Sequence, residues 1–282
     1  MKTIEYWLVR AILASVAVCP ALASLYVKLL DRAVPRFRRI ARRNLEIARI
    51  AQDGVIDGMF RSIARILVTF AKMPSITKAN AGHWIRYDGL ENFRNAMACG
   101  KGVLVATAHF GNWELSAFTH ALMTGPMNVV VRPLDNAKLD DFVERLRALS
   151  GNPIISKRDA AKGILRALHA GQAVGILIDQ NVAREEGVFI DFFGVKACAG
   201  TAFVRFAHHS GAPVVPGYAF WSQDENKYVL RFDPAIPLTG DIQSDTQRIH
   251  SHWESVIRKR PDQYFWIHRR WKTRPEGEAS LY

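Results

Sequence analysis

The sequence predicts an α/β fold with a mixed, mainly parallel sheet flanked by helices, preceded by an N-terminal helical membrane anchor. From Gly89 onward, short apolar runs rich in valine and isoleucine alternate with helical patterns, which is typical of a parallel sheet covered by helices. The chain has 282 residues, of which 49% are hydrophobic, so it can bury one sizeable core. Residues 1–30 are mostly apolar and lead into a basic cluster, a pattern that indicates contact with a membrane.

Changes in composition divide the chain into four segments. We expect an apolar membrane anchor at 1–30, a basic helical lead-in at 31–88, an α/β catalytic domain at 89–275 and a short tail at 276–282. The three cysteines have no C-x-x-C spacing, which argues against a zinc or redox site. We expect them to be buried packing residues.

The N-terminal apolar stretch has three interpretations: a cleaved signal peptide, a lipoprotein signal, which the residues on either side of Cys19 disfavour, and an uncleaved anchor. Its cleanest part, 11–27, is 17 residues long with Pro20 in the middle, which is the short limit for a transmembrane helix. Residues 21–23 resemble a signal-peptide cleavage site, but eight basic residues between 28 and 49 face only two acidic ones and would resist translocation. We therefore favour an uncleaved anchor that spans the membrane or lies in its interface, with the rest of the chain on the cytoplasmic side.

The elements follow in order from hydrophobic periodicity. The expected helix at 55–72 carries an apolar stripe, which we interpret as core packing rather than as the wall of an acyl groove. The expected helices cover 35–52, 55–72, 90–98, 113–123, 138–149, 160–169, 202–209 and 242–259, and the expected strands cover 103–108, 128–132, 153–155, 173–179, 188–190, 214–221 and 227–232.

The candidate catalytic pair lies at the junction of strand 103–108 and helix 113–123. The strand delivers His109 at its carboxyl end, where open α/β sheets carry their catalytic groups. Gly111 permits a sharp turn, Asn112 can cap the helix, and Glu114 falls in the first helical turn. A histidine before the turn and a glutamate after it can face each other, as a general base and its orienting carboxylate.

The block Thr-Ala-His-Phe-Gly-Asn-Trp-Glu-Leu at 107–115 resembles the active-site block of the bacterial lipid A late acyltransferases, a branch of the lysophospholipid acyltransferase superfamily. The similarity continues, in the family's order, through 131–136, 175–181, 187–194 and 261–272. The resemblance implies a membrane-associated O-acyltransferase, with His109 as general base aided by Glu114. It implies no metal and no bound cofactor.

Four further residues are candidates for substrate binding. Arg132 ends the strand next in sequence, and the matching arginine of the family is associated with the substrate pocket. It can hold a phosphate or an oxyanion, or form a surface salt bridge. Asp179 and Gln180 end another apolar strand and can bind Arg132 or the acceptor. Asn112, at the helix N-terminus, can help to stabilise the oxyanion.

The expected partners all suit a net charge of +12. By resemblance, the donor is an acyl carrier protein thioester and the acceptor is a phosphorylated glycolipid such as a lipid A precursor. An anionic surface of the inner membrane, on its cytoplasmic side, is the third partner. The segment 266–272 mixes tryptophan with cations and is interpreted as part of a membrane or carrier-binding surface rather than as a nucleic-acid patch.

Two rival hypotheses remain open from the sequence. In the first, the same chemistry serves another acceptor, such as a phosphoinositide mannoside or a lysophospholipid. In the second, the chain is a non-catalytic, basic membrane- or nucleic-acid-binding protein.

Overall fold

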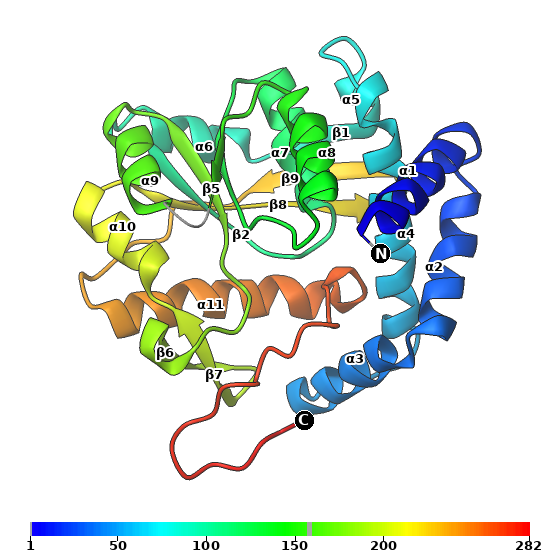
Figure 1. Ribbon diagram of the computed structural model, residues 1–282. Coiled ribbons are helices and arrows are strands. Elements are labelled where there is room, and N and C mark those ends of the chain that lie inside the picture. The colour runs from blue at the N-terminus through cyan, green and yellow to red at the C-terminus, as the bar shows by residue number, and fades with distance from the viewer. Residues whose placement is uncertain (1, 157–159) are drawn as a thin grey trace.

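The computed structural model describes residues 2–156 and 160–282 and confirms an α/β fold with a mainly parallel sheet (Figure 1). Among the described residues, strands β8, β2, β5, β3 and β4 run parallel, whereas β9 and β1 run in the opposite direction at one edge. In spatial order the strands are β1 (Ile85–Asp88), β9 (Lys227–Phe232), β8 (Val214–Ser222), β2 (Val103–Thr107), β5 (Ala173–Leu177), β3 (Asn128–Val131) and β4 (Ile154–Ser156).

Two layers of helices cover the sheet, and the central strand β2 contributes to both cores. Val103 and Val105 join the core beneath α6 (Leu90–Met97), α7 (Trp113–Met123) and α8 (Ala137–Ala148). Leu104 and Ala106 join the core beneath α9 (Ala160–His169), α10 (Ala202–Ser210) and α11 (Ile242–Lys259). Burial on both faces explains why the strand reads as a continuous apolar run.

The N-terminal residues form helices that pack beside the sheet. They are α1 (Lys2–Val18), α2 (Leu22–Ala33), α3 (Pro35–Ala48) and α4 (Val55–Lys72), and the chain turns between α1 and α2 at Pro20. No helix within residues 2–156 and 160–282 is both long and apolar enough to cross a bilayer. The apolar stripe of α4 packs against the core, as expected.

Several boundaries match the sequence prediction and others do not. Helices α4, α7, α9 and α11 and strand β9 have the predicted bounds. The lead-in to residue 88 is not purely helical, because it ends in α5 (Ala81–Trp84) and β1, which pairs with β9. Short 3-10 helices cover Met73–Ser75, Arg184–Glu186 and Pro261–Gln263.

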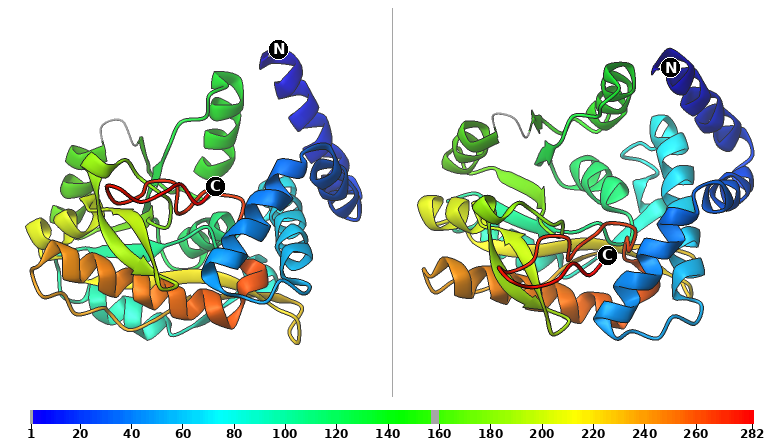
Figure 2. Two further views of the ribbon diagram at one scale, coloured as in Figure 1. Left: turned by 90° about the horizontal axis from the view of Figure 1, so that it is seen from below. Right: turned by 60° about the horizontal axis from the view of Figure 1, so that its bottom comes forward.

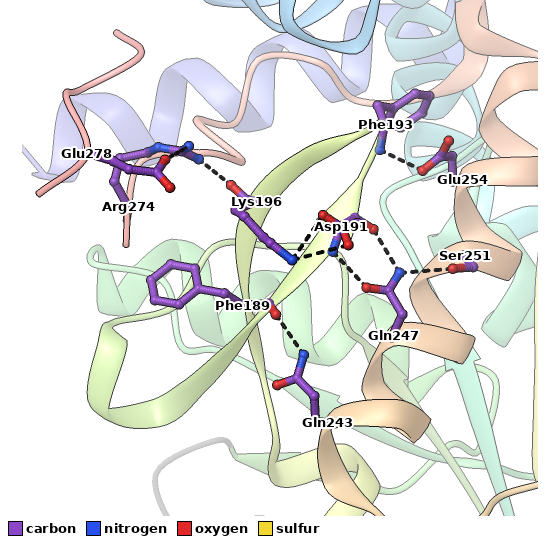
Figure 3. Close-up of polar contacts among 10 residues, drawn as sticks. All are labelled: Phe189, Asp191, Phe193, Lys196, Gln243, Gln247, Ser251, Glu254, Arg274 and Glu278. Atoms are coloured by element: carbon purple, nitrogen blue, oxygen red, sulfur yellow. Dashed lines mark hydrogen bonds and ion pairs between the residues drawn. The ribbon is translucent and has the colours of Figure 1, made fainter. Parts of the chain in front are cut away.

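The predicted strand at 188–190 does not belong to the main sheet. It is part of β6 (Gly187–Phe192), which forms a separate antiparallel hairpin with β7 (Val195–Gly200). Side chains of α11 bind the free edge of β6 (Figure 3). Gln247 accepts a hydrogen bond from the Asp191 main-chain nitrogen and donates one to its carbonyl, at 2.7 and 2.8 Å. Gln243 donates to the Phe189 carbonyl, and Glu254 accepts from the Phe193 nitrogen. Helix α11 therefore supplies hydrogen-bond partners to main-chain groups at a strand edge that would otherwise lack them.

Two predictions about exposure were wrong: that the segment 266–272 lies at the surface, and that all three cysteines are buried. Trp266, Arg270 and Trp271, which we placed on a membrane or carrier-binding surface, are at most 1% exposed and lie in the core. Their segment lies between the β6–β7 hairpin and α3, where the Asn44 amide donates to the carbonyl oxygens of Trp266 and His268. Of the cysteines, two are exposed, and Cys198 is buried.

Candidate active site

A tight turn after β2 positions His109. Gly111 has a φ of +57°, and a Cβ atom there would lie 1.7 Å from the carbonyl oxygen of Ala219. Only glycine lets the two main-chain segments approach so closely. Helix α7 begins at Trp113, and Asn112 caps it by accepting a hydrogen bond from the Leu115 nitrogen at 3.0 Å. His109 therefore sits between a buried strand and the N-terminus of a helix.

The carboxylate that binds His109 is Asp179. Strands β2 and β5 are neighbours, with Thr107 opposite Leu177, so the residues two positions further along each strand also meet. Asp179 Oδ1 lies 2.9 Å from His109 Nδ1, and Asp179 Oδ2 accepts a hydrogen bond from the His109 main-chain nitrogen at 3.1 Å. We expected Glu114 on the imidazole and Asp179 on Arg132 or the acceptor; the structure instead pairs Asp179 with the imidazole.

The ion pair sets the charge and the tautomer of His109. Burial lowers the pKa of the imidazole, but the charge and hydrogen bond of Asp179 outweigh it, so the pKa lies above its usual value. Burial by itself would raise the pKa of Asp179, but the charge and hydrogen bonds of His109 keep the pKa of this carboxyl group below its usual value. An ionised carboxylate accepts only, so Nδ1 carries a proton and the neutral ring has its lone pair on Nε2.

Glu114 is paired with Arg147 of α8 rather than with His109. The guanidinium donates from Nε and Nη2 to the two carboxylate oxygens at 2.9 and 2.5 Å. Both side chains are largely buried, with 14% and 21% exposed. Glu114 nevertheless lines the same cavity as His109, and its negative charge also favours the imidazolium.

The His109 side chain opens into a cavity of about 1150 Å³. His109 Nε2 lies 3.5 Å from the amide nitrogen of Gln180, and both residues line this space. The cavity is lined by more cations than acids: Arg132, Arg147, Lys162 and Arg205 against Glu114 and Glu186. The remaining walls are largely apolar, so the cavity offers both charged and hydrophobic surface.

The other predicted substrate residues divide between the cavity and the interior. Arg132 and Gln180 are exposed and line the cavity. Arg132 is further from His109 than its place in the sequence suggests, because β5 lies between β2 and β3. Asn112 is fully buried, and its amide donates to Thr69 at 2.8 Å while it caps α7. Asn112 is therefore a structural residue rather than a substrate ligand.

Sequence reasoning missed three residues near the site. Arg147 lies on a helix whose sequence carries no recognisable motif. Only the tertiary structure shows that it pairs with Glu114. His268 lines the cavity and accepts from the Asn181 nitrogen at 2.9 Å, and burial lowers its pKa to about 4, which keeps it neutral. Arg270 is buried near Asp179 and donates to the Cys198 carbonyl at 2.6 Å. The last two lie in the block at 261–272 that carries the resemblance.

The family with the description "bacterial lipid A biosynthesis acyltransferase" has a sequence model that matches residues 1–273. The chain belongs to this family. The lipid A biosynthesis palmitoleoyltransferase of Escherichia coli is 30% identical over 276 residues, which cover 93% of this chain and 89% of that protein. The lipid A biosynthesis lauroyltransferase of the same organism is also 30% identical, over 90% of this chain and 85% of its own length. A lipid A biosynthesis acyltransferase of Haemophilus influenzae is 27% identical over 82% of this chain and 72% of its own length.

This lipid A acyltransferase therefore needs an acyl donor and a lipid acceptor. His109 lies at the carboxyl edge of the sheet, in a cavity lined by cations and by apolar side chains.

Proposed function

We propose that this acyltransferase moves a fatty acyl chain from an acyl carrier protein thioester to a hydroxyl group of a lipid A precursor, with His109 as the general base. The observation that carries the proposal is the hydrogen bond between His109 Nδ1 and Asp179. It leaves Nε2 as the basic atom at the cavity, within reach of a bound hydroxyl group.

The chemistry needs one proton acceptor and no covalent enzyme intermediate. Nε2 of His109 takes the proton of the acceptor hydroxyl while its oxygen attacks the thioester carbonyl carbon. The tetrahedral intermediate collapses by breaking the carbon–sulfur bond, and the leaving thiolate takes the proton from the imidazolium. Asp179 stabilises the transient imidazolium and holds the ring orientation.

Glu114 supports the same step without touching the imidazole. Its charge adds to that of Asp179 in favouring the imidazolium, and its bidentate contact holds Arg147 at the cavity wall. Arg132 and Gln180, which are exposed in the cavity, bind phosphate or sugar groups of the acceptor or the developing oxyanion.

The apolar part of the cavity is the place for the acyl chain. Its walls come from the strands on one side and from α9 and α10 on the other. Burial of methylene groups there is favourable by about 0.8 kcal/mol each. The residues that line this part include Val129, Val131, Ile164, Ile176, Phe203 and Phe206.

The acyltransferase works at the surface of the inner membrane, on its cytoplasmic side. Helix α1 exposes large apolar side chains to solvent: Ile4, Trp7 and Leu8 are 74%, 61% and 58% exposed. Its N-terminal end lies beside α8 (Figure 2), where the Lys2 ammonium donates to the Asp135 carbonyl at 2.9 Å. Such a helix lies in the interface with its apolar face in the lipid and basic residues against anionic headgroups.

The decisive experiment combines detergent-extracted protein, an acyl carrier protein thioester and a lipid A precursor, with products read by mass spectrometry. We expect wild type to add one acyl group to the lipid and His109→Ala, at unchanged thermal stability, to add none. Acylation of the lipid by the folded His109→Ala protein would overturn the assignment of the base. Consumption of thioester without acylated lipid would overturn the proposed acceptor.

A further inference from the structure

A second cavity, of about 470 Å³, lies between α2, α4 and the turn that joins β8 to β9. It shares no lining residue with the His109 cavity. Ala23 and Ser24 come from α2, Arg61, Arg65 and Thr69 from α4, and the remaining wall from α5 and the strand ends. The site is therefore a separate feature that the acyl-transfer chemistry leaves without a role.

The cavity gathers positive charge with no acidic residue in its lining. Arg61, Arg65 and Lys227 line it, together with His83. Within residues 2–156 and 160–282, these three cationic side chains take part in no ion pair of 4.0 Å or less. By contrast, the half-buried side chains of Arg38, Arg147 and Arg274 each have a carboxylate oxygen within 4.0 Å.

Arg65 is the centre of this group. It is half-buried, and its guanidinium lies 4.7 Å from the centre of the Trp221 ring, a geometry that fixes its plane. Burial lowers the pKa of Arg65, and repulsion from Arg61 lowers it further, although Tyr228 and Asp262 offset part of this effect. An anion bound between the two guanidinium groups would relieve that repulsion.

The other walls fit an anion attached to an apolar body. Trp84, Trp221 and Tyr228 supply aromatic surface, and Ser24 and Asn226 supply polar groups nearer solvent. The helix that forms one wall, α2, exposes Leu25 and Leu29 to solvent at 49% and 50%. The aromatic part of the lining offers apolar surface to the part of a ligand that follows a phosphate at the arginines.

We propose that this second cavity binds the phosphate group of an anionic glycerophospholipid, with Arg65 and Arg61 as its charge partners. The phosphate accepts hydrogen bonds from both guanidinium groups, and the glycerol and the first methylene groups lie along Trp221 and Trp84. The site is a membrane-lipid site distinct from the acceptor site at His109. It does not depend on the acyl-transfer reaction.

Cosedimentation with vesicles tests the proposal on the full-length acyltransferase. Vesicles of phosphatidylcholine alone are compared with vesicles that also contain phosphatidylglycerol, at physiological ionic strength. The pocket variant is Arg61→Gln/Arg65→Gln. The matched control is Arg94→Gln/Lys101→Gln, which removes the same charge from two exposed residues that line none of the cavities described here.

We expect the pocket variant to bind phosphatidylglycerol vesicles about tenfold more weakly than wild type, and the control to lose about twofold or less. Thermal unfolding checks that both variants are folded, and Arg65→Lys, which keeps the charge, should bind better than Arg65→Gln. Equal losses in pocket variant and control would show general electrostatic attraction and overturn the site. Because the site is independent of catalysis, His109→Ala should bind these vesicles as wild type does.

Tryptophan fluorescence separates the lipid from a free anion. Short-chain phosphatidylglycerol below its micelle concentration should change the emission of wild type, through Trp221 beside Arg65. It should change that of Trp221→Phe much less. Inorganic phosphate and short-chain phosphatidylcholine are the comparison ligands. A response to inorganic phosphate at the same concentration as to phosphatidylglycerol would overturn the assignment of a lipid.

Discussion

Asp179 holds His109 twice, through the ring Nδ1 at 2.9 Å and through the main-chain nitrogen at 3.1 Å. The second contact ties the carboxylate to the register of β2 and β5, so the imidazole orientation is set by the sheet rather than by a flexible side chain. Glu114, five residues after His109, lies close enough for its charge to favour the imidazolium, but it accepts its hydrogen bonds from Arg147. The two carboxylates therefore have separable roles.

Replacement of Asp179 should harm catalysis more than replacement of Glu114. We expect Asp179→Asn to lower kcat by about 10²- to 10⁴-fold, because the ring loses the carboxylate that orients it and stabilises its cation. Glu114→Gln, which keeps the shape of the side chain, should lower kcat less. Steady-state kinetics with a carrier-protein thioester measure kcat of both variants. A larger loss of kcat in Glu114→Gln would show that Glu114, rather than Asp179, orients the imidazole.

The pH profile of the acyltransferase should report the same ion pair. Transfer needs the neutral imidazole, so kcat/KM should rise with pH through the pKa of His109, which lies above 6.5 because of Asp179. Removal of the charge in Asp179→Asn leaves burial dominant, and the acidic limb should move to lower pH. A profile of the variant with an unchanged midpoint would contradict the assignment of that limb to His109.

The pH dependence of the free energy of unfolding should follow the directions of the pKa shifts of His109 and Asp179. The raised pKa of His109 contributes stability that is complete below its unfolded value of 6.5 and is lost as pH rises through the folded value. The lowered pKa of Asp179 contributes stability that is present above 3.8 and is lost as pH falls through the folded value. The free energy of unfolding of wild type should thus exceed that of Asp179→Asn most between about pH 4 and 6.5. Denaturant titrations across pH measure this difference.

The pair of Glu114 and Arg147 should be energetically coupled. In a double-mutant cycle of Glu114→Gln and Arg147→Met, we expect a coupling free energy of about 1–3 kcal/mol, because each single variant leaves a largely buried group unpaired. The exposed pair Arg43 and Glu46, with 45% and 44% of the side chains exposed, serves as the control and should give about 0.5 kcal/mol or less. Equal coupling in both cycles would mean that burial adds nothing to the contact.

Gly111→Ala should destabilise the fold. The new Cβ would lie 1.7 Å from the Ala219 carbonyl oxygen, at a φ of +57°, so we expect a loss of about 3 kcal/mol or more. Gly125→Ala is the control, since a Cβ there meets nothing within 4 Å. Urea unfolding monitored by circular dichroism compares the two, and similar midpoints would show that the turn can relax.

Polar substitutions on α1 should weaken membrane binding without unfolding the protein. Trp7→Ser/Leu8→Ser removes two large side chains that are 61% and 58% exposed. Insertion of such side chains is worth about 1.5–3 kcal/mol each, so vesicle affinity should fall at least about tenfold. Leu149→Ser, which changes a leucine that is 55% exposed at the end of α8, is the control. An equal loss in the control would argue against a specific role of α1.

Local pattern in the sequence predicted most of the elements correctly. The bounds of α7 and β9, for example, follow from apolar periodicity and from a capping asparagine that the structure confirms at 3.0 Å. Strand β1 was missed because it has only four residues, and β7 was missed because its small side chains do not alternate clearly between apolar and polar. The tryptophans at 266 and 271 were misplaced because the same aromatic and cationic composition suits either an interface or a buried crossing segment.

The sequence by itself determined that His109 follows a buried strand, that a glycine turn and a helix come next, and that the chain resembles lipid A acyltransferases. Only the tertiary structure decided which carboxylate reaches the imidazole. Strand order is a long-range property that no local period encodes, and β5, from a distant part of the chain, inserts between β2 and β3. That insertion places Asp179 against His109 and moves Arg132 one strand away, while Glu114 turns to Arg147.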